Sequence, residues 1–141
     1  MILIVDDEPR QVDSYLQELK FSRFEVELKE DVDEALDFVR QRRHEIELLI
    51  LDIIMPPGGL GPEDTRQGLR SGLVFFDRVR GLVPDLPVLV LTNVSDRRAA
   101  DHFRGRERVR LLLKEDWLPF ELVEEVIDFL SETAGRGGLP A

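Results

Sequence analysis

Short, continuous apolar segments alternate along this chain with longer segments whose apolar residues recur at helical spacing. Four of the short segments are rich in Ile, Val and Leu, which is typical of strands buried on both faces. These segments are residues 2–5, 48–51, 88–91 and 109–113. A fifth segment, residues 24–28, alternates between apolar and polar side chains, which predicts an edge strand.

The segments between these strands carry helical patterns. Apolar residues at i, i+3, i+4 and i+7 follow the first strand as Val12, Tyr15, Leu16 and Leu19. Asp31 and Glu34 resemble a capping box at the start of the next helix, and later helices are predicted to begin near Gly72 and at Pro119. Residues 95–105 offer few packing groups and predict a short, loosely held helix. Five strand–helix units predict an α/β fold with a parallel sheet and right-handed crossovers.

Polar side chains stand where four of these strands end. Asp6 and Asp7 follow the first strand, Asp52 follows the third, Thr92 the fourth and Lys114 the fifth. In a parallel sheet the carboxyl ends of the strands share one edge, where open α/β folds bind ligands. Carboxylates suit a hard cation such as Mg²⁺, and an ammonium and a hydroxyl suit the oxygens of a phosphoryl group. An aspartate in such a site can attack phosphorus and form an aspartyl phosphate.

Composition narrows the classes of function. The 141 residues fit one domain, and 43% hydrophobic with 34% charged residues is typical of a globular protein. The net charge of −10 argues against nucleic acid as a direct partner. The absence of cysteine excludes disulfides and thiolate chemistry. Neither a signal peptide nor a membrane span is visible, so a cytoplasmic location without membrane contact is expected.

Four segments of the chain together resemble the receiver domains of two-component response regulators, of the chemotaxis-regulator type. They read ILIVDDEP, LLILDIIMP, VLVLTN and LLLKED, in the order the family has them, and they span nearly the whole chain. The resemblance implies a (βα)5 doubly wound, flavodoxin-like receiver fold, whose five parallel strands lie in the order 2-1-3-4-5. We expect the receiver domain at residues 1–133 and a flexible C-terminal tail at residues 134–141.

The resemblance also implies a magnesium site. Asp7 and Asp52 would ligate Mg²⁺ directly, Asp6 would act largely through water, and the backbone carbonyl of Ile54 would complete the protein ligands. Mg²⁺ is therefore the expected cofactor.

The remaining implied roles concern phosphoryl transfer. Asp52 would be the phosphoacceptor, Lys114 would pair with its carboxylate and then with the phosphoryl group, and Thr92 would hydrogen-bond a phosphoryl oxygen. A sensor histidine kinase or a phosphotransfer protein would be the donor, and a second protein would receive the signal. The expected protein is a stand-alone receiver that assists its own phosphorylation and dephosphorylation, rather than an enzyme acting on other substrates.

Three alternatives remain open at this point. The first is a binding module that does not use phosphorylation, and the second is the receiver fragment of a longer regulator. The third is a Mg²⁺-dependent phosphatase of the haloacid-dehalogenase type. The last class needs a second acid two residues after its aspartate, and Asp52-Ile53-Ile54 lacks it.

The chain departs from the family pattern in three places. Glu115 follows Lys114 where the family usually has a cis proline, which predicts a trans bond or a strained turn. The connection over residues 56–71 is longer than usual, and is expected to be a lid, a partner contact or a flexible insertion. A cluster of arginines is expected to form a solvated face or a docking patch for an acidic partner. It comprises Arg97, Arg98, Arg104, Arg106, Arg108 and Arg110.

The larger aromatic side chains complete the prediction. Tyr15, Trp117 and the phenylalanines are expected in the core, where their apolar area would be buried.

Overall fold

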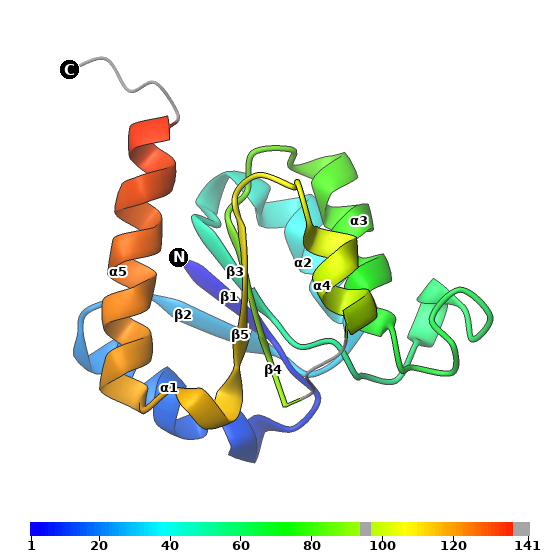
Figure 1. Ribbon diagram of the computed structural model, residues 1–141, viewed down its shortest axis with the longest axis horizontal. Coiled ribbons are helices and arrows are strands. Elements are labelled where there is room, and N and C mark those ends of the chain that lie inside the picture. Colours follow the sequence, from blue (N-terminus) through cyan, green and yellow to red (C-terminus); the bar gives the residue numbers. More distant parts are fainter. Residues whose placement is uncertain (94–96, 137–141) are drawn as a thin grey trace.

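Five parallel strands form the centre of the molecule in the computed structural model, which describes residues 1–93 and 97–136 (Figure 1). The strands are β1 (Ile2–Val5), β2 (Val26–Lys29), β3 (Leu48–Leu51), β4 (Val88–Thr92) and β5 (Val109–Leu113). They lie in the order β2-β1-β3-β4-β5, and every neighbouring pair is parallel. The predicted flavodoxin-like topology with an edge strand at β2 is confirmed.

The register of β1 against β3 sets up the functional edge of the sheet. Val5 lies opposite Leu51, and the backbone N–H of Asp52 donates to the carbonyl of Val5 over 3.1 Å. The residues that follow these two strands are therefore neighbours across the sheet, which brings Asp6 next to Asp52.

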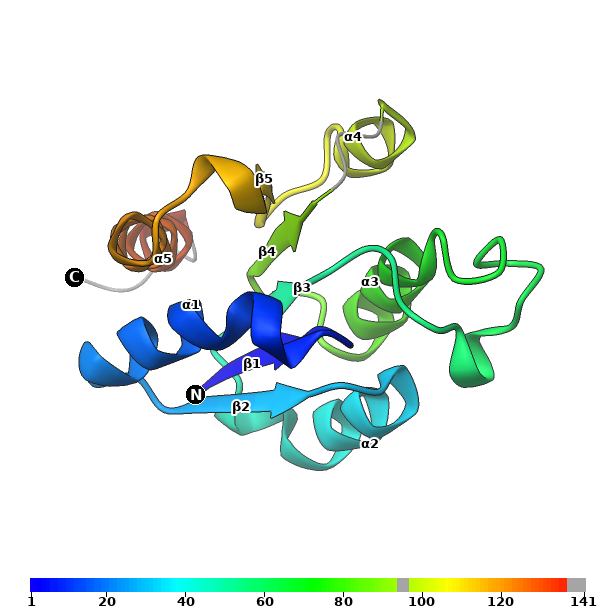
Figure 2. The ribbon, with the colours of Figure 1, turned by 90° about the horizontal axis from the view of Figure 1, so that it is seen from below.

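Helices cover both faces of the sheet, as Figure 2 shows from below. They are α1 (Pro9–Phe21), α2 (Val32–Arg42), α3 (Ser71–Leu82), α4 (Arg97–Phe103) and α5 (Pro119–Arg136), with short 3-10 turns η1 (Arg43–Glu45), η2 (Gly58–Leu60) and η3 (Lys114–Asp116). Helices α1 and α5 lie on one face, and α2, α3 and α4 lie on the other. Because successive residues of a strand point to opposite faces, the strand side chains divide between two buried clusters.

Within the described residues, no helix is long and apolar enough to cross a lipid bilayer. Asp31 caps α2 as expected, because its carboxylate accepts from the N–H groups of Asp33 and Glu34 at 2.8 and 3.0 Å. Helix α4 has seven residues, and residues 94–96 before it lie outside the described part of the chain. Residues 137–141 of the predicted tail also lie outside it.

Three details differ from the sequence prediction. Strand β5, which the sequence predicts to be buried on both faces, lies at an edge of the sheet and its residues are only partly buried. Strand β2 begins at Val26 rather than at Phe24, because the Phe24 N–H still donates to the carbonyl of Leu19 at the end of α1. The prediction that all phenylalanines are buried is wrong for Phe21 and Phe120, which are 85% and 54% exposed.

A close backbone approach at Gly72 couples α3 to the functional edge. The N–H of Gly72 donates to the carbonyl of Ile53 over 2.8 Å, and a Cβ atom at this position would lie 2.2 Å from the backbone oxygen of Asp52. Only glycine therefore lets the start of α3 pack against the end of β3 without moving one of them.

Replacing Gly72 with alanine is expected to lower the free energy of unfolding by about 2 kcal/mol, because the new methyl group overlaps backbone that has no room to move. Chemical denaturation measures this change. The matched control is Gly81→Ala in the same helix, where nothing lies within 4 Å of the added Cβ. That variant is expected to gain about 0.5 kcal/mol from helix propensity. Equal effects of the two substitutions would contradict the close approach.

Candidate functional site

Three carboxylates gather at the carboxyl ends of β1 and β3. Asp6 and Asp7 follow β1 and Asp52 follows β3, and one oxygen from each lies within 4.8 Å of the others. Asp6 and Asp52 are buried and Asp7 is half-buried. Carboxylate oxygens are the ligands that hard divalent cations prefer, so the cluster could hold such an ion.

Backbone donors orient two of these carboxylates. The N–H of Glu8 donates to Oδ1 of Asp6 over 2.9 Å, and the N–H of Ile53 donates to Oδ1 of Asp52 over 2.7 Å. The remaining oxygen of each group, Oδ2, faces the ammonium of Lys114.

Burial and mutual repulsion make the ionised acids costly. Burial raises the pKa of Asp52 above its usual value, and the charge of Asp6 raises it further, while Lys114 acts in the opposite direction. Burial and the charge of Asp6 likewise raise the pKa of Asp7. The cluster therefore favours binding of positive charge.

Lys114 places a positively charged ammonium among these carboxylates. Its Nζ donates to Oδ2 of Asp6 at 2.8 Å and lies 3.4 Å from Oδ2 of Asp52, and the side chain is almost fully buried. Burial alone would lower the pKa of Lys114, but the hydrogen bond to Asp6 and the charge of Asp52 outweigh it and raise the pKa. The ammonium therefore stays charged in the site.

A small cavity of about 140 Å³ adjoins Asp52 on the side of β4. Thr92, the last residue of β4, is fully buried and lines it together with Asn93, Ile54 and Asp52. The structure thus brings together Asp6, Asp7, Asp52, Thr92 and Lys114, all of which the sequence singled out. Ile54 lines the cavity with a side chain that is 40% exposed, and the role of its carbonyl as a metal ligand stays a prediction.

Gln11 is a site residue that the sequence did not reveal. Its Oε1 accepts from Nζ of Lys114 at 3.0 Å and from Nδ2 of Asn93 at 2.8 Å, and its Nε2 donates to the carboxylate of Glu8. The amide thereby bridges three loops across the mouth of the cavity. Its position in the first turn of the helix after the Asp6–Asp7 pair was the available signal.

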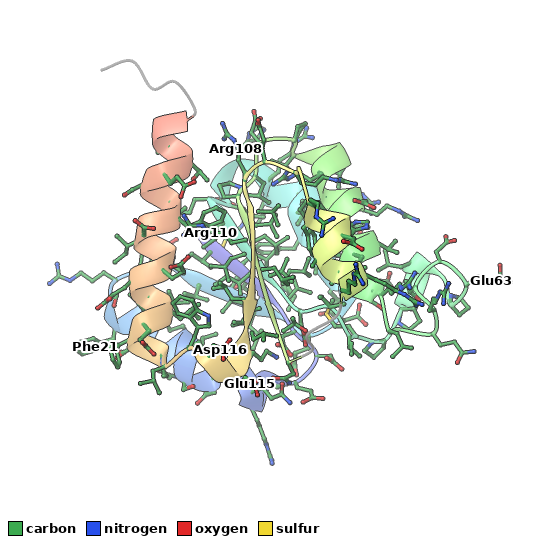
Figure 3. All side chains as sticks on the ribbon, viewed as in Figure 1. Phe21, Glu63, Arg108, Arg110, Glu115 and Asp116 are labelled. Carbon is green, nitrogen blue, oxygen red and sulfur yellow. The ribbon has the colours of Figure 1, made fainter. Side chains whose placement is uncertain are left out.

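The long connection over residues 56–71 forms one wall of the site. Gly68 and Gln67 line a second cavity of about 400 Å³ with Asp7 and Ile54. The N–H of Gly59 donates to both carboxylate oxygens of Asp33 in α2, at 2.9 and 3.1 Å. The ends of the connection are thus packed against the domain, whereas Glu63 at its tip projects beyond α3 (Figure 3).

Four of the clustered arginines contact groups of the protein itself. Arg104 and Arg106 pair with Asp101 and Asp77 at 2.8 and 3.2 Å, and Arg108 donates to the carbonyl of Asp85. Arg110 lies between β5 and α5 (Figure 3), where it pairs with Glu125, Asp128 and Glu132. These contacts favour a structural role for the four over a free docking patch.

Comparison with known families agrees with this geometry. The family model described as "Response regulator receiver domain" matches residues 2–126. The response regulator MprA of Mycobacterium tuberculosis strain H37Ra is 37% identical over 101 residues, which is 70% of this chain and 38% of that protein. MprA of Mycobacterium avium is 36% identical over the same shares. The chain therefore spans less than half the length of these curated relatives.

Solved structures share the fold. A CheY-like receiver domain protein from Methanospirillum hungatei has a TM-score of 0.77 at 21% identity, with 96% of each chain covered. A putative response regulator from Chloroflexus aurantiacus has a TM-score of 0.70 at 27% identity, covering 92% of this chain and 96% of its own. CheY of Borrelia burgdorferi, solved in a CheX–CheY–BeF3–Mg²⁺ complex, has a TM-score of 0.71 at 16% identity, covering 90% of this chain and 86% of that one.

The crowding of the carboxylates predicts how Asp7→Asn affects stability. Because the pKa of Asp7 is raised in the folded state, its contribution to stability falls as the pH rises from the ordinary aspartate range through the raised value. At neutral pH the substitution is expected to add about 0.5 kcal/mol, a small gain because solvent screens a half-exposed carboxylate. It is also expected to reduce the stabilisation by millimolar MgCl₂. Thermal melts with and without MgCl₂ measure both effects.

Asp13→Asn on the exposed face of α1 is the control. It removes the same charge without touching the cluster, and it is expected to keep the full response to MgCl₂. If Asp7→Asn kept that response as well, the cluster would not be the cation site.

Proposed function

The chain belongs to the response regulator receiver domain family, and from this we propose that it accepts a phosphoryl group on Asp52 and passes the signal on by protein contacts. The observation that carries the proposal is the position of the Lys114 ammonium, which lies 2.8 Å from Asp6 and 3.4 Å from Asp52, and Asp52 in turn lines a small cavity. This arrangement can receive the oxygens of a group bonded to Asp52. A phosphohistidine of a sensor kinase or phosphotransfer protein is the proposed donor.

The transfer exchanges one bond to phosphorus for another. A carboxylate oxygen of Asp52 attacks phosphorus, and the P–N bond to the donor histidine breaks. The imidazole leaves with the electron pair of that bond and takes up a proton. The product is an acyl phosphate on Asp52, and with acetyl phosphate as donor the leaving group is acetate.

Residues around Asp52 assist this exchange by position and charge. The backbone N–H of Ile53 holds one carboxylate oxygen, so the carboxylate faces Lys114 in a fixed orientation. Lys114 would neutralise charge on the oxygens of the transferring group, and the hydroxyl of Thr92 would hydrogen-bond one of them. Such preorganised groups lower the barrier because they need little rearrangement during the reaction.

Asp6, Asp7 and Asp52 are the residues that would hold Mg²⁺, with the carbonyl of Ile54 as a further ligand. When bound, the ion would neutralise the acids and the incoming phosphoryl oxygens. The donor set of carboxylate oxygens fits this ion. The Borrelia complex, which contains Mg²⁺ and BeF3 with a protein of the same fold, supports the choice of metal.

The output is proposed to be a contact with another protein or with another part of a longer regulator. The longer curated relatives make the second arrangement as reasonable as a stand-alone receiver at residues 1–133. A cytoplasmic location is proposed, because the expected donors act on a receiver there. The chain is proposed to act as a signalling domain, with its chemistry confined to its own Asp52.

Acetyl phosphate with Mg²⁺ is expected to add a single phosphoryl group to the wild-type protein, measured as intact mass. Asp52→Asn is expected to abolish the adduct, because it removes the nucleophilic oxygen. Thr92→Ala is expected to slow its formation roughly tenfold, since one hydrogen bond to the transferring group is lost.

Asp37→Asn, on the exposed side of α2, is the control and is expected to leave adduct formation unchanged. An unmodified wild-type protein with intact fold would support the binding module that does not use phosphorylation. Repeated turnover of phosphate esters would support the phosphatase. Either result would overturn the proposal.

A further inference from the structure

We propose that the hydroxyl of Tyr15 positions Lys114 for phosphoryl transfer by holding both ends of the turn that carries it. The inference rests on the proposed function of Lys114 and adds to it a residue that does not touch the phosphoryl group. Tyr15 lies in α1, and its ring packs in the buried cluster beneath that helix.

The sheet places a demand on the turn after β5. In the order β1-β3-β4-β5, the strand that precedes Lys114 lies three strand spacings from β1, which is about 14 Å. A lysine side chain is too short to span that distance. The chain must therefore bend back over the ends of β4 and β3 before Nζ can reach Asp6.

The turn itself has few internal contacts that could stabilise this bend. It consists of η3 (Lys114–Asp116), closed by a bond of 3.3 Å from the N–H of Trp117 to the carbonyl of Lys114. Glu115 and Asp116 are exposed, and Figure 3 shows both at the functional edge below β5. The Lys114–Glu115 peptide bond is trans, which agrees with one of the two expectations from the sequence.

Tyr15 holds the turn from the opposite side of the site. Its hydroxyl lies 2.9 Å from the carbonyl oxygen of Lys114 and 2.8 Å from that of Trp117. The single hydroxyl proton is donated to these two acceptors, either shared or in alternation. The two carbonyls belong to the first residue of the turn and to the residue after its last, so one group fixes both ends.

Gln11 extends this contact to the other end of Lys114. Gln11 and Tyr15 are four residues apart in α1 and so share one face of the helix. Gln11 accepts from Nζ of Lys114 at 3.0 Å, whereas Tyr15 donates to its backbone carbonyl. One face of α1 thus contacts Lys114 both at its ammonium and at its backbone carbonyl. The same helix begins three residues after Asp6.

The test compares Tyr15→Phe with the wild type. The substitution removes the hydroxyl and leaves the ring in the core, so the fold is retained. The maximal rate of phosphorylation by acetyl phosphate at saturating MgCl₂ is expected to fall roughly tenfold, because a slightly displaced ammonium stabilises the transferring group less well. The KM for acetyl phosphate and the Mg²⁺ dissociation constant are expected to stay within about twofold, because the acids are untouched. The fluorescence of Trp117, the only tryptophan, follows Mg²⁺ binding.

Thr133→Val is the matched control. Thr133 is a buried hydroxyl that donates to the carbonyl of Phe129 over 3.0 Å, near the far end of α5. Its replacement removes a hydrogen bond of the same kind away from the site, so stability changes and the phosphorylation rate does not. A second comparison adds Tyr15→Phe to Lys114→Gln, where we expect no further loss of rate, because the hydroxyl acts through the lysine.

Three outcomes distinguish a failure of the proposed function from a failure of the inference about Tyr15. If the wild type forms no adduct, the proposed function fails. If the wild type reacts and Tyr15→Phe reacts at the same rate, or loses rate equally in the Lys114→Gln background, Tyr15 does not position Lys114. If Lys114→Gln does not fold, the rates and Mg²⁺ affinities of Tyr15→Phe and Thr133→Val decide alone, and equal rates overturn the inference.

Discussion

The site depends on one constraint, which is that three carboxylates lie close together at one edge of the sheet. The adjacency of β1 and β3 forces Asp6 next to Asp52, and the residue after Asp6 adds a third carboxylate. Burial, and then repulsion between carboxylates this close, makes it costly for all three to be ionised, and both effects raise the pKa values of Asp7 and Asp52. The fold offsets it in part by burying the ammonium of Lys114 among them.

Lys114 brings one positive charge to a cluster of three carboxylates, so the cluster is short of positive charge. Three carboxylates around one ammonium could hold a divalent cation. Under the proposed function, that cation and Lys114 would together attract the dianionic phosphoryl group. The same arrangement makes the location of Lys114 critical, because its strand lies far from β1. Two side chains from successive turns of α1 contact Lys114, Gln11 at the ammonium and Tyr15 at the backbone carbonyl.

Much of this architecture follows from the sequence, because it depends on local pattern. Continuous apolar runs bounded by polar residues identify buried strands, and parallel pairing then brings the strand-end residues to one edge. That is why the positions of Asp6, Asp7, Asp52, Thr92 and Lys114 were correctly expected, along with the cap at Asp31.

Contacts between distant side chains and backbone groups could not be predicted in this way. Tyr15 fits the apolar stripe of an amphipathic helix, and nothing in that pattern indicates a bond to a carbonyl 99 residues away. Gln11 lies beside the stripe and reads as an ordinary surface residue. The internal partners of Arg110 on α5 depend in the same way on how β5 and α5 pack, so the sequence predicted only a solvated face or a docking patch there.

The central claim is that Asp52 carries the phosphoryl group. Borohydride reduces an acyl phosphate to an alcohol, so treating the phosphorylated protein with it and mapping the peptides by mass spectrometry locates the modified residue. The account predicts homoserine at position 52 and unreduced aspartate at positions 6 and 7. Reduction at either of those positions with Asp52 unchanged, or a phosphoryl group stable to borohydride on another residue, would contradict it.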